Sequence, residues 1–428
     1  MESDQTQSDH PPTYTLIKSC RICKSKDLKP FLKFGEMPLA GGFIKKEDLS
    51  KEKLYPLTVA FCQQCKETQV LETVSPEILF NDYRYVSSTT TTLSNHFKHY
   101  AKTMHERFLD EKSLVVEFGS NDGVLLEPFG EIGVKAIGVE PAKNIAKLAR
   151  QKNCEVINSF FNSNTAQDIK DKHGEASLIC ANNVFAHIDD IHEPLRGIKL
   201  LLKEDGVFVF EVHYLGKVIE EMQYDMIYHE HLYYYSLLSA IEHFRRYNMV
   251  VFDLKLVPIH AGSLRLYVSK ECSKHALKIS DAVQLLAEKE RAKGYDKFWS
   301  FQKFSNEVAT TKTKLIKVLK KIKSEGKTIA GYGSSGRANT MIQYCEITED
   351  LVSYMIDDAP AKTGFFTPGS HLEIFPSSIL SGNDAPDYVL VFAWSFFDEI
   401  LKRNKNYIKA GGRMILPLPQ VKIYPEAE

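Results

Sequence analysis

Short apolar runs alternate with helix-like stretches through the middle of this 428-residue chain. Four runs rich in branched aliphatic residues are typical of buried parallel strands, and they lie at residues 114–118, 136–139, 177–181 and 207–212. Two later runs, 250–257 and 263–268, could close the same sheet as additional strands. The alternation favours βαβ units. We therefore predict an α/β domain with a Rossmann-like parallel sheet over residues 76–275.

The pattern restarts after a lysine-rich helical stretch that ends near Lys327. Four further apolar runs lie at residues 328–333, 352–357, 388–394 and 413–417, and a plausible helix follows each of the first three. Residues 276–428 are thus predicted to form a second, smaller Rossmann-like α/β domain. The first 75 residues show little helical periodicity and form a third, separate segment.

Two CxxC motifs define this N-terminal segment. They comprise Cys20, Cys23, Cys62 and Cys65, with 38 residues between the pairs. Two such pairs supply the four thiolates of a tetrahedral zinc site, and a closed set of four leaves no position for catalysis. We expect a structural zinc ion in a small domain over residues 1–75. A redox CxxC or a chance occurrence is the alternative.

Composition narrows the possible partners and location. Hydrophobic residues make up 43% of the chain and charged residues 25%, with 54 basic and 55 acidic side chains. A formal net charge of −1 gives no overall attraction to nucleic acid or to an anionic membrane. The polar N-terminus does not resemble a signal peptide, and no apolar run approaches the roughly 20 residues of a membrane span. We expect a cytoplasmic monomer that binds neither nucleic acid nor membrane.

A glycine loop follows the first strand of the predicted sheet. Its sequence is Glu-x-Gly-x-x-x-Gly, with Glu117 at the strand end, Gly119 at the turn, Asn121 within the loop and Gly123 at the start of the next helix. Glu140 ends the next strand, where an acid typically accepts the ribose hydroxyls. An acid at the strand end suits the cationic amino group of S-adenosylmethionine (SAM). NAD is the rival ligand, and the missing third glycine argues against it.

The most unusual stretch of the chain runs from Tyr224 to Tyr235 and contains Tyr228, His229, Glu230 and His231. It follows a strand whose carboxyl end should face the ligand crevice. A histidine can accept a proton at neutral pH, a carboxylate can orient its ring, and a tyrosine can hold an oxyanion. His187 follows another strand and should face the same crevice. A second metal site or a helix with surface histidines is the alternative.

Taken together, these motifs resemble the SAM-dependent sugar C-methyltransferases of branched deoxysugar biosynthesis, such as the tetronitrose and mycarose 3-C-methyltransferases. The resemblance covers nearly the whole chain. Besides the CxxC pairs, the glycine loop and the histidine cluster, it rests on residues 34–40, 82–88, 182–187, 260–265, 331–333 and 367–369.

The family implies a zinc domain, a SAM-binding domain, and a C-terminal domain that helps to hold a sugar nucleotide. It implies that His231 is the base, that Tyr228 and Glu230 lie close to it, and that His187 lies at the substrate. It places Tyr83 and Asn182 at SAM, although Tyr85 is an alternative to Tyr83. The expected substrate contacts are His229, His260, Ser263, Arg265, Tyr332 and Arg337. Ala261 and Arg337 replace the usual glycine and lysine of the family, and Arg337 could grip a phosphate with two hydrogen bonds.

The expected reaction is methylation at carbon 3 of a nucleotide-linked 4-keto-6-deoxy sugar. We predict that His231 removes the carbon-3 proton, that Tyr228 or His187 stabilises the enolate oxygen, and that Glu230 orients the site. The carrier, dTDP or GDP, stays open. Three alternatives remain: O- or N-methylation of a related sugar, a zinc-containing nucleic-acid-binding protein, and an NAD-dependent epimerase or dehydrogenase.

Overall fold

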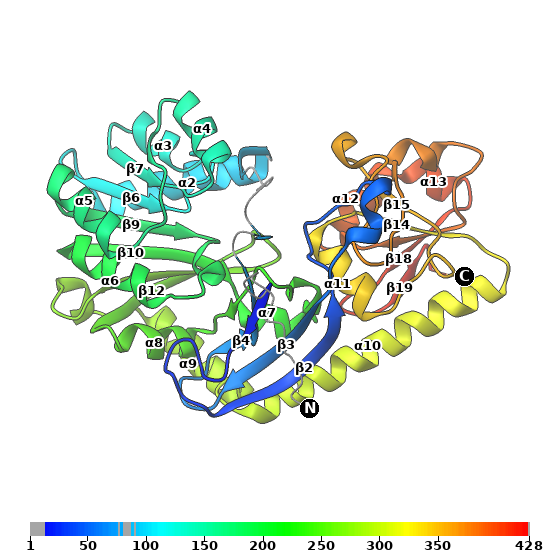
Figure 1. Ribbon diagram of the computed structural model, residues 1–428, viewed down its shortest axis with the longest axis horizontal. Helices are drawn as coiled ribbons and strands as arrows, with labels where there is room; N and C mark the ends of the chain where they lie inside the picture. Colours follow the sequence, from blue (N-terminus) through cyan, green and yellow to red (C-terminus); the bar gives the residue numbers. More distant parts are fainter. Residues whose placement is uncertain (1–12, 76–77, 80–86, 90, 427–428) are drawn as a thin grey trace, which may run out of the picture.

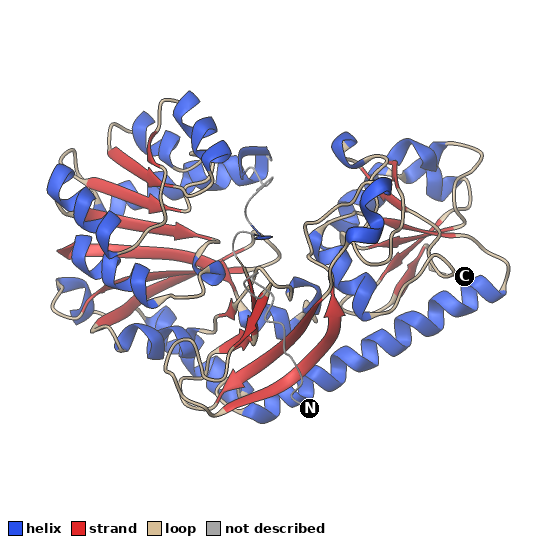
Figure 2. Cartoon of the chain, viewed as in Figure 1, coloured by secondary structure: helices blue, strands red, loops and turns tan. Residues whose placement is uncertain are grey.

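The computed structural model describes residues 13–75, 78–79, 87–89 and 91–426. Figure 1 shows two α/β lobes that are joined by the N-terminal strands and by one long helix. In each lobe the strands form a sheet with helices on its two faces (Figure 2). The predicted fold class, with a small N-terminal part and two Rossmann-like parts, is confirmed. Within the described residues, no helix combines the length and the apolar character needed to cross a bilayer.

The first lobe contains a seven-stranded sheet in the order β12-β13-β10-β9-β6-β7-β8. Its strands are β6 (Leu114–Phe118), β7 (Lys135–Val139), β8 (Glu155–Ile157), β9 (Ala176–Asn182), β10 (Leu202–His213), β12 (Met249–Val257) and β13 (Ser263–Lys270). β13 is antiparallel to both its neighbours, β10 and β12, while the other strand pairs are parallel. The two late strands were expected, whereas the three-residue β8 was not.

Helices cover both faces of this sheet because its strands are apolar on both sides. In β6, Val115 packs with Tyr100 of the helix α2, and Val116 packs on the opposite face. The helices are α2 (Thr91–Phe108), α3 (Leu126–Glu131), α4 (Lys143–Gln151), α5 (Ser163–His173), α6 (His192–Leu201), α7 (Leu215–Glu220) and α8 (Leu237–Arg245). From β6 the chain runs outward through β7 and β8, and then returns to β9 on the other side. This reversal places a ligand crevice at the carboxyl ends of β6 and β9.

The N-terminal part is a four-stranded sheet in the order β11-β4-β3-β2, beside a two-stranded β1–β5 pair. Its strands are β1 (Tyr14–Leu16), β2 (Leu28–Met37), β3 (Tyr55–Cys62), β4 (Thr68–Val70), β5 (Glu72–Val74) and β11 (Tyr233–Tyr234). β11 belongs in sequence to the first α/β part, directly after the histidine cluster. The N-terminal sheet therefore includes a piece of the segment that was predicted to be catalytic.

The second lobe follows helices α9 (Asp281–Lys293) and α10 (Phe298–Ser324). It has a six-stranded sheet in the order β16-β15-β14-β17-β18-β19. The strands are β14 (Ile329–Tyr332), β15 (Met355–Asp357), β16 (Ile374–Pro376), β17 (Tyr388–Val391), β18 (Arg413–Leu416) and β19 (Lys422–Tyr424), and the helices are α11 (Gly336–Tyr344), α12 (Phe397–Arg403) and α13 (Lys405–Lys409). Short 3-10 turns lie at η1 (Lys46–Lys51), η2 (Ser87–Thr89), η3 (Phe185–His187), η4 (Tyr224–Met226), η5 (Lys274–Leu277), η6 (Pro360–Lys362), η7 (Ser377–Ser381) and η8 (Trp394–Phe396).

The N-terminal sheet packs against both lobes. Cys20 and Cys62 belong to the same buried apolar cluster as Phe185 and Phe210 of the first lobe. On the other side, the ring of Phe61 stacks on Phe301 of α10 at a centroid distance of 4.5 Å. Continuous apolar packing on both sides fixes the N-terminal sheet as a bridge between the lobes.

Candidate functional site

The four cysteines predicted to bind zinc come together in space. Their sulfur atoms all lie within 4.8 Å of one another, and the Cys20–Cys65 and Cys23–Cys62 sulfur pairs are 3.5 Å apart. These separations fit a tetrahedral zinc ion, because Zn–S bonds of about 2.3 Å place thiolates roughly 3.8 Å apart. Four sulfur ligands complete a tetrahedral coordination shell and leave no open position for a substrate, so a zinc ion bound there would be structural.

Both CxxC turns have the same backbone geometry. The residue after each pair, Lys24 or Lys66, has a positive φ of 60° or 65°. Its amide donates to the carbonyl of Cys20 or Cys62 at 2.9 Å. This left-handed step closes each turn, so that two sulfurs converge on one point.

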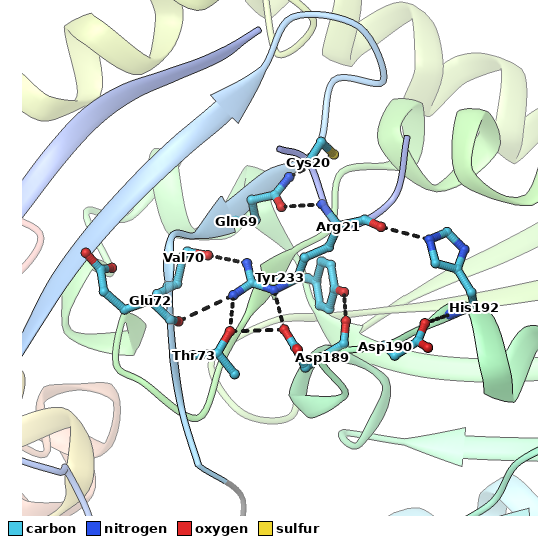
Figure 3. A network of polar contacts seen from close by, with 10 residues as sticks. All are labelled: Cys20, Arg21, Gln69, Val70, Glu72, Thr73, Asp189, Asp190, His192 and Tyr233. Atoms are coloured by element: carbon cyan, nitrogen blue, oxygen red, sulfur yellow. Dashed lines mark hydrogen bonds and ion pairs between the residues drawn. The ribbon is translucent and has the colours of Figure 1, made fainter. Parts of the chain in front are cut away.

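Arg21 lies inside the first CxxC turn and links it to the first lobe (Figure 3). The buried guanidinium donates through Nε to Asp189 Oδ1 at 2.7 Å. Its other N–H groups bind the carbonyls of Val70 and Glu72 and the Thr73 hydroxyl. Because one side chain satisfies acceptors on β4, β5 and the loop after His187, it fixes these three segments relative to one another.

The segment after the histidine cluster is held between the same two parts. The Leu232 amide donates to the Ala186 carbonyl at 2.8 Å, and the Leu232 carbonyl accepts from Val70 at 3.0 Å. The Tyr233 hydroxyl donates to the Asp189 carbonyl at 2.9 Å (Figure 3). The N-terminal sheet thus holds His187 and His231, which are 44 positions apart in the sequence, beside one another.

The glycine loop after β6 has the geometry of a nucleoside site. Gly119 has a φ of 64°, and a Cβ atom there would lie 2.6 Å from Val184. Glu117 is buried at the strand end, and burial raises the pKa of its carboxyl to about 8. Asn182 donates to Glu117 Oε1 at 3.1 Å, while Oε2 is buried without a hydrogen-bond partner among the described residues. A cationic amino group placed there would supply the missing donor, which fits SAM.

Glu140 lies at the end of β7, as expected of a ribose-binding acid. Its two carboxylate oxygens accept from the backbone amides of Asn121 at 3.0 Å and Ala142 at 2.9 Å. Burial raises its pKa. Each oxygen retains a second lone pair that could accept from a ribose hydroxyl.

Replacing Glu140 by Ala should weaken SAM binding by about 10- to 100-fold, because hydrogen bonds to a charged acceptor contribute roughly 1.5–3 kcal/mol. Isothermal titration calorimetry of the variant would measure the loss. Glu131→Ala, at an exposed acid of the neighbouring helix α3, is the matched control and should bind SAM normally. An unchanged affinity in Glu140→Ala would remove this residue from the cofactor site.

His231 is oriented as a base. Its Nδ1 lies 2.9 Å from the Met226 carbonyl oxygen. A carbonyl can only accept, so Nδ1 carries the proton and Nε2 is the unprotonated nitrogen. Burial lowers the pKa of His231 to about 4, so that the ring is neutral at physiological pH. The ring centroids of Tyr228 and His187 lie 4.1 Å and 5.0 Å away, respectively.

The structure brings His187 and Glu230 into the same region as His231. Burial, followed by the charge of His231, lowers the pKa of His187 to about 3. Burial raises the pKa of Glu230 to about 7, and the Glu230 carboxylate faces Gly41, where an added Cβ would lie 3.7 Å from Oε1. His187 and His231 are neighbouring rings whose pKa values are both lowered, and such perturbed titratable pairs are common at catalytic sites.

His229 points away from this group. It is buried, its Nε2 donates to the Pro56 carbonyl at 3.1 Å, and its ring makes an edge contact with Tyr55. These contacts anchor the motif to β3 of the N-terminal sheet. A substrate contact for His229 stays a prediction.

The Arg265 side chain is buried in the sheet and paired with an acidic residue. Its guanidinium binds Glu211 with a shortest distance of 2.7 Å and lies over the Tyr100 ring at 3.8 Å. His96 completes this group through Glu211 Oε1 at 3.1 Å. Ser263 donates to the Ile259 carbonyl at 3.2 Å, and burial lowers the pKa of His260. Substrate contacts for these three residues stay predictions.

Arg337 lies at the start of α11 and binds the first lobe rather than an open loop. Its Nε and Nη2 donate to Asp225 at 2.9 Å and 3.2 Å, and the Trp394 indole donates to the same carboxylate at 2.9 Å. Asp225 directly precedes Met226, whose carbonyl orients His231. Asp225 therefore connects residues of the second lobe to the turn that orients His231. Tyr332, predicted beside Arg337, donates instead to Asp358 at 2.9 Å.

Sequence reasoning did not single out His96, His213, Gln223 and Asp225 as site residues. His213 ends β10 and directly follows the strand predicted at residues 207–212, so its position was a usable signal. Asp225 lies within the 224–235 stretch but was given no role there, whereas His96 and Gln223 carry no motif and are revealed only by their tertiary contacts. Tyr83 and Tyr85 lie outside the described residues.

Three family models together match most of the chain. They are "Putative zinc binding domain" over residues 20–80, "Methyltransferase domain" over 93–253 and "C-methyltransferase C-terminal domain" over 258–419. The C-methyltransferase NovU of Streptomyces niveus is 33% identical over 409 residues, which cover 95% of this chain and 97% of NovU.

Solved methyltransferases resemble a part of the chain at low identity. A methyltransferase of Haloferax volcanii in complex with Trm112 is 16% identical, with a TM-score of 0.34, over 42% of this chain and 92% of that one. Magnesium protoporphyrin IX methyltransferase of Synechocystis PCC 6803 is 11% identical, with a TM-score of 0.30, over 42% of this chain and 78% of that one. On the full-length match to NovU and the three domain models, the chain belongs to the family of zinc-containing, SAM-dependent C-methyltransferases.

Proposed function

We propose that this enzyme methylates carbon 3 of a nucleotide-linked 4-keto-6-deoxy sugar. The observation that carries the proposal is the fixed tautomer of His231, whose Nδ1–H is bound to the Met226 carbonyl. This leaves an unprotonated Nε2 beside Tyr228 and His187. A carbon nucleophile needs such a base, because a C–H bond next to a ketone must first lose its proton.

Different side chains have different roles in the proposed reaction. His231 Nε2 accepts the carbon-3 proton, and the electron pair of that C–H bond moves toward the carbon-4 ketone oxygen. Tyr228 or the neutral His187 donates a hydrogen bond to this oxygen as negative charge develops on it. Glu230 orients the groups of the site. Glu117, Asn182 and Glu140 would hold the amino acid and ribose portions of SAM, which would supply an electrophilic methyl group. Zinc supplies no chemistry to these steps.

We propose that the second lobe holds the nucleotide's phosphates at residues 331–337. Its glycine loop repeats the geometry of the SAM loop. Gly333 donates to the Ile356 carbonyl as Gly119 donates to Val139, both at 2.8 Å. Asp357 accepts from the Ser334 amide at 2.8 Å, much as Glu140 accepts from the loop amide in the first lobe. Arg337 uses two N–H groups for Asp225 and retains three others for an anion.

We propose that the chain divides into a zinc domain (1–75), a SAM domain (76–275) and a nucleotide-binding domain (276–428).

The proposal predicts that dTDP-4-keto-6-deoxyglucose or its GDP-mannose-derived counterpart gains one methyl group at carbon 3. Product mass and carbon-13 NMR would identify the carbon. In deuterated buffer without SAM, the carbon-3 proton should exchange faster with the enzyme than without it, because proton removal precedes methyl transfer. A methyl group on oxygen or nitrogen, or a product with no exchange at carbon 3, would contradict the proposal.

A further inference from the structure

His213, the last residue of β10, lies close to the proposed catalytic site, but the mechanism above does not use it. Its neighbour Tyr214 donates to the Gly262 carbonyl at 3.2 Å, which places His213 next to the 260–263 turn. Its Nε2 lies 3.0 Å from Gln223 Oε1, just before the η4 turn that leads to Met226. The histidine is therefore held between two segments that border the His231 crevice.

The surroundings of Gln223 determine which nitrogen of His213 carries the proton. The Gln223 amide nitrogen donates to the Ala261 carbonyl at 2.9 Å and to Glu221 Oε2 at 2.8 Å. Both partners are acceptors, so the amide cannot be flipped, and its oxygen must face His213. An amide oxygen cannot donate. His213 Nε2 therefore carries the proton, and Nδ1 has a free lone pair.

This Nδ1 atom is buried and has no hydrogen-bond partner among the described residues. Burial of an unsatisfied acceptor is unfavourable, so such an atom calls for a hydrogen-bond donor. Burial, and then the charges of Arg337 and His231, lower the pKa of His213 to about 3. The ring therefore stays neutral and keeps its acceptor.

His213 and His231 present opposite tautomers. His231 keeps its proton on Nδ1 and offers Nε2, whereas His213 keeps its proton on Nε2 and offers Nδ1. A keto-sugar has two kinds of polar group that need partners. Its ketone oxygen needs a donor, which the groups around His231 supply, and its hydroxyl groups need acceptors.

We propose that His213 Nδ1 accepts a hydrogen bond from a sugar hydroxyl and thereby contributes to the choice of sugar. The inference rests on the proposed nucleotide-sugar substrate. It makes His213 a specificity-determining residue, with His231 remaining the base. A site that pairs a buried acceptor with a substrate hydroxyl discriminates strongly against analogues that lack it, because the acceptor is then left unpaired.

A purely structural role for His213, in which the ring only ties Gln223 to β10, predicts a different pattern of variants. Asn at this position places its side-chain oxygen near the place of Nδ1 and loses the contact with Gln223. Gln reaches the place of Nε2, where its amide N–H can still donate to Gln223, and loses the Nδ1 acceptor. The pair His213→Asn and His213→Gln therefore separates the two roles of one ring.

The experiment measures binding of dTDP-4-keto-6-deoxyglucose and of SAM to the full-length zinc-loaded enzyme by calorimetry. We expect His213→Gln to raise the Kd of the sugar nucleotide by about tenfold or more, as the loss of one buried hydrogen bond implies. His213→Asn should retain most of the affinity. The Kd of SAM and the melting temperature of His213→Gln should stay close to those of the wild type.

The reverse order, with His213→Gln resembling the wild type and His213→Asn weakened, would overturn the inference and assign His213 a structural role. Equal weakening in both variants with a lowered melting temperature would overturn it as well. Binding of the probe without methylation of carbon 3 would contradict the proposed reaction, while the Asn/Gln comparison would still decide the role of His213. If wild-type enzyme did not bind the probe, both proposals would fall.

Discussion

Replacing His231 by Asn is expected to lower kcat by about 10²- to 10⁴-fold, which is the usual contribution of a general base. Asn can still donate to the Met226 carbonyl from the position of Nδ1, so the turn should keep its shape. It has no basic atom at the position of Nε2. Single-turnover assays should show the loss in the chemical step, while the Kd of SAM should stay nearly unchanged because the proposed base acts on the sugar and not on the cofactor.

His229→Asn is the matched control, since it changes a second histidine of the same tetrapeptide. The wild-type ring donates to the Pro56 carbonyl and makes an edge contact with Tyr55, both of which belong to the N-terminal sheet. Its loss should reduce the free energy of unfolding by about 1–3 kcal/mol with little effect on kcat. If His231→Asn lost methyl transfer but still exchanged the carbon-3 proton at the wild-type rate, another residue would be the base.

The pH profile tests the same assignment. Burial lowers the pKa of His231 to about 4, and below its pKa the protonated ring cannot accept a proton. The acid limb of kcat/KM that is due to His231 should therefore lie nearer pH 4 than the ordinary value of 6.5. Glu230, whose pKa burial raises to about 7, would give a limb near pH 7 if its charge is required. His231→Asn and Glu230→Gln should each remove one limb.

The sequence predicted the central sheet well because its strands are apolar runs buried on both faces. β6 begins and ends where its apolar run does, and β9 and β10 extend past theirs by a few residues at one or both ends. β8 could not be predicted, since only Val156 of its three residues is buried. β11 has two residues and exists only through its pairing with Gln69 and Thr68. Such an element is determined by tertiary packing and leaves no periodic signal.

Parts of the candidate site could be predicted where residue type and spacing alone indicate the chemistry. The four cysteines and the Glu117 loop are cases of this kind. Arg265 and Arg337 show the limit, since a sequence gives the charge of an arginine but not its partner. The partners, Glu211 and Asp225, lie 54 and 112 positions away. The unpaired nitrogen of His213 is likewise defined by Gln223 and by what Gln223 itself binds.

The zinc centre supplies no catalytic position, yet its removal should strongly reduce methyl transfer. The turn that carries Cys20 and Cys23 also carries Arg21, which holds Asp189 and the edge of β4. β4 in turn pairs with β11, directly after His231. Loss of the ion would release the two CxxC turns. The contacts that keep His187 beside His231 would then be lost as well.

Cys62→Ser is therefore expected to lose zinc, to unfold the N-terminal sheet, and to lower kcat by about 10²-fold or more. A displacement of about 1 Å between reacting groups is enough for a loss of that size. Structural zinc contributes of order 10 kcal/mol to the folding of small domains, so the melting temperature should also fall sharply. Elemental analysis, thermal unfolding and turnover of the same preparation would measure all three effects. Cys272→Ser, at an exposed cysteine outside the cluster, is the control and should change none of them. A zinc-free Cys62→Ser enzyme with wild-type turnover would show that the catalytic segments hold their places without the N-terminal sheet.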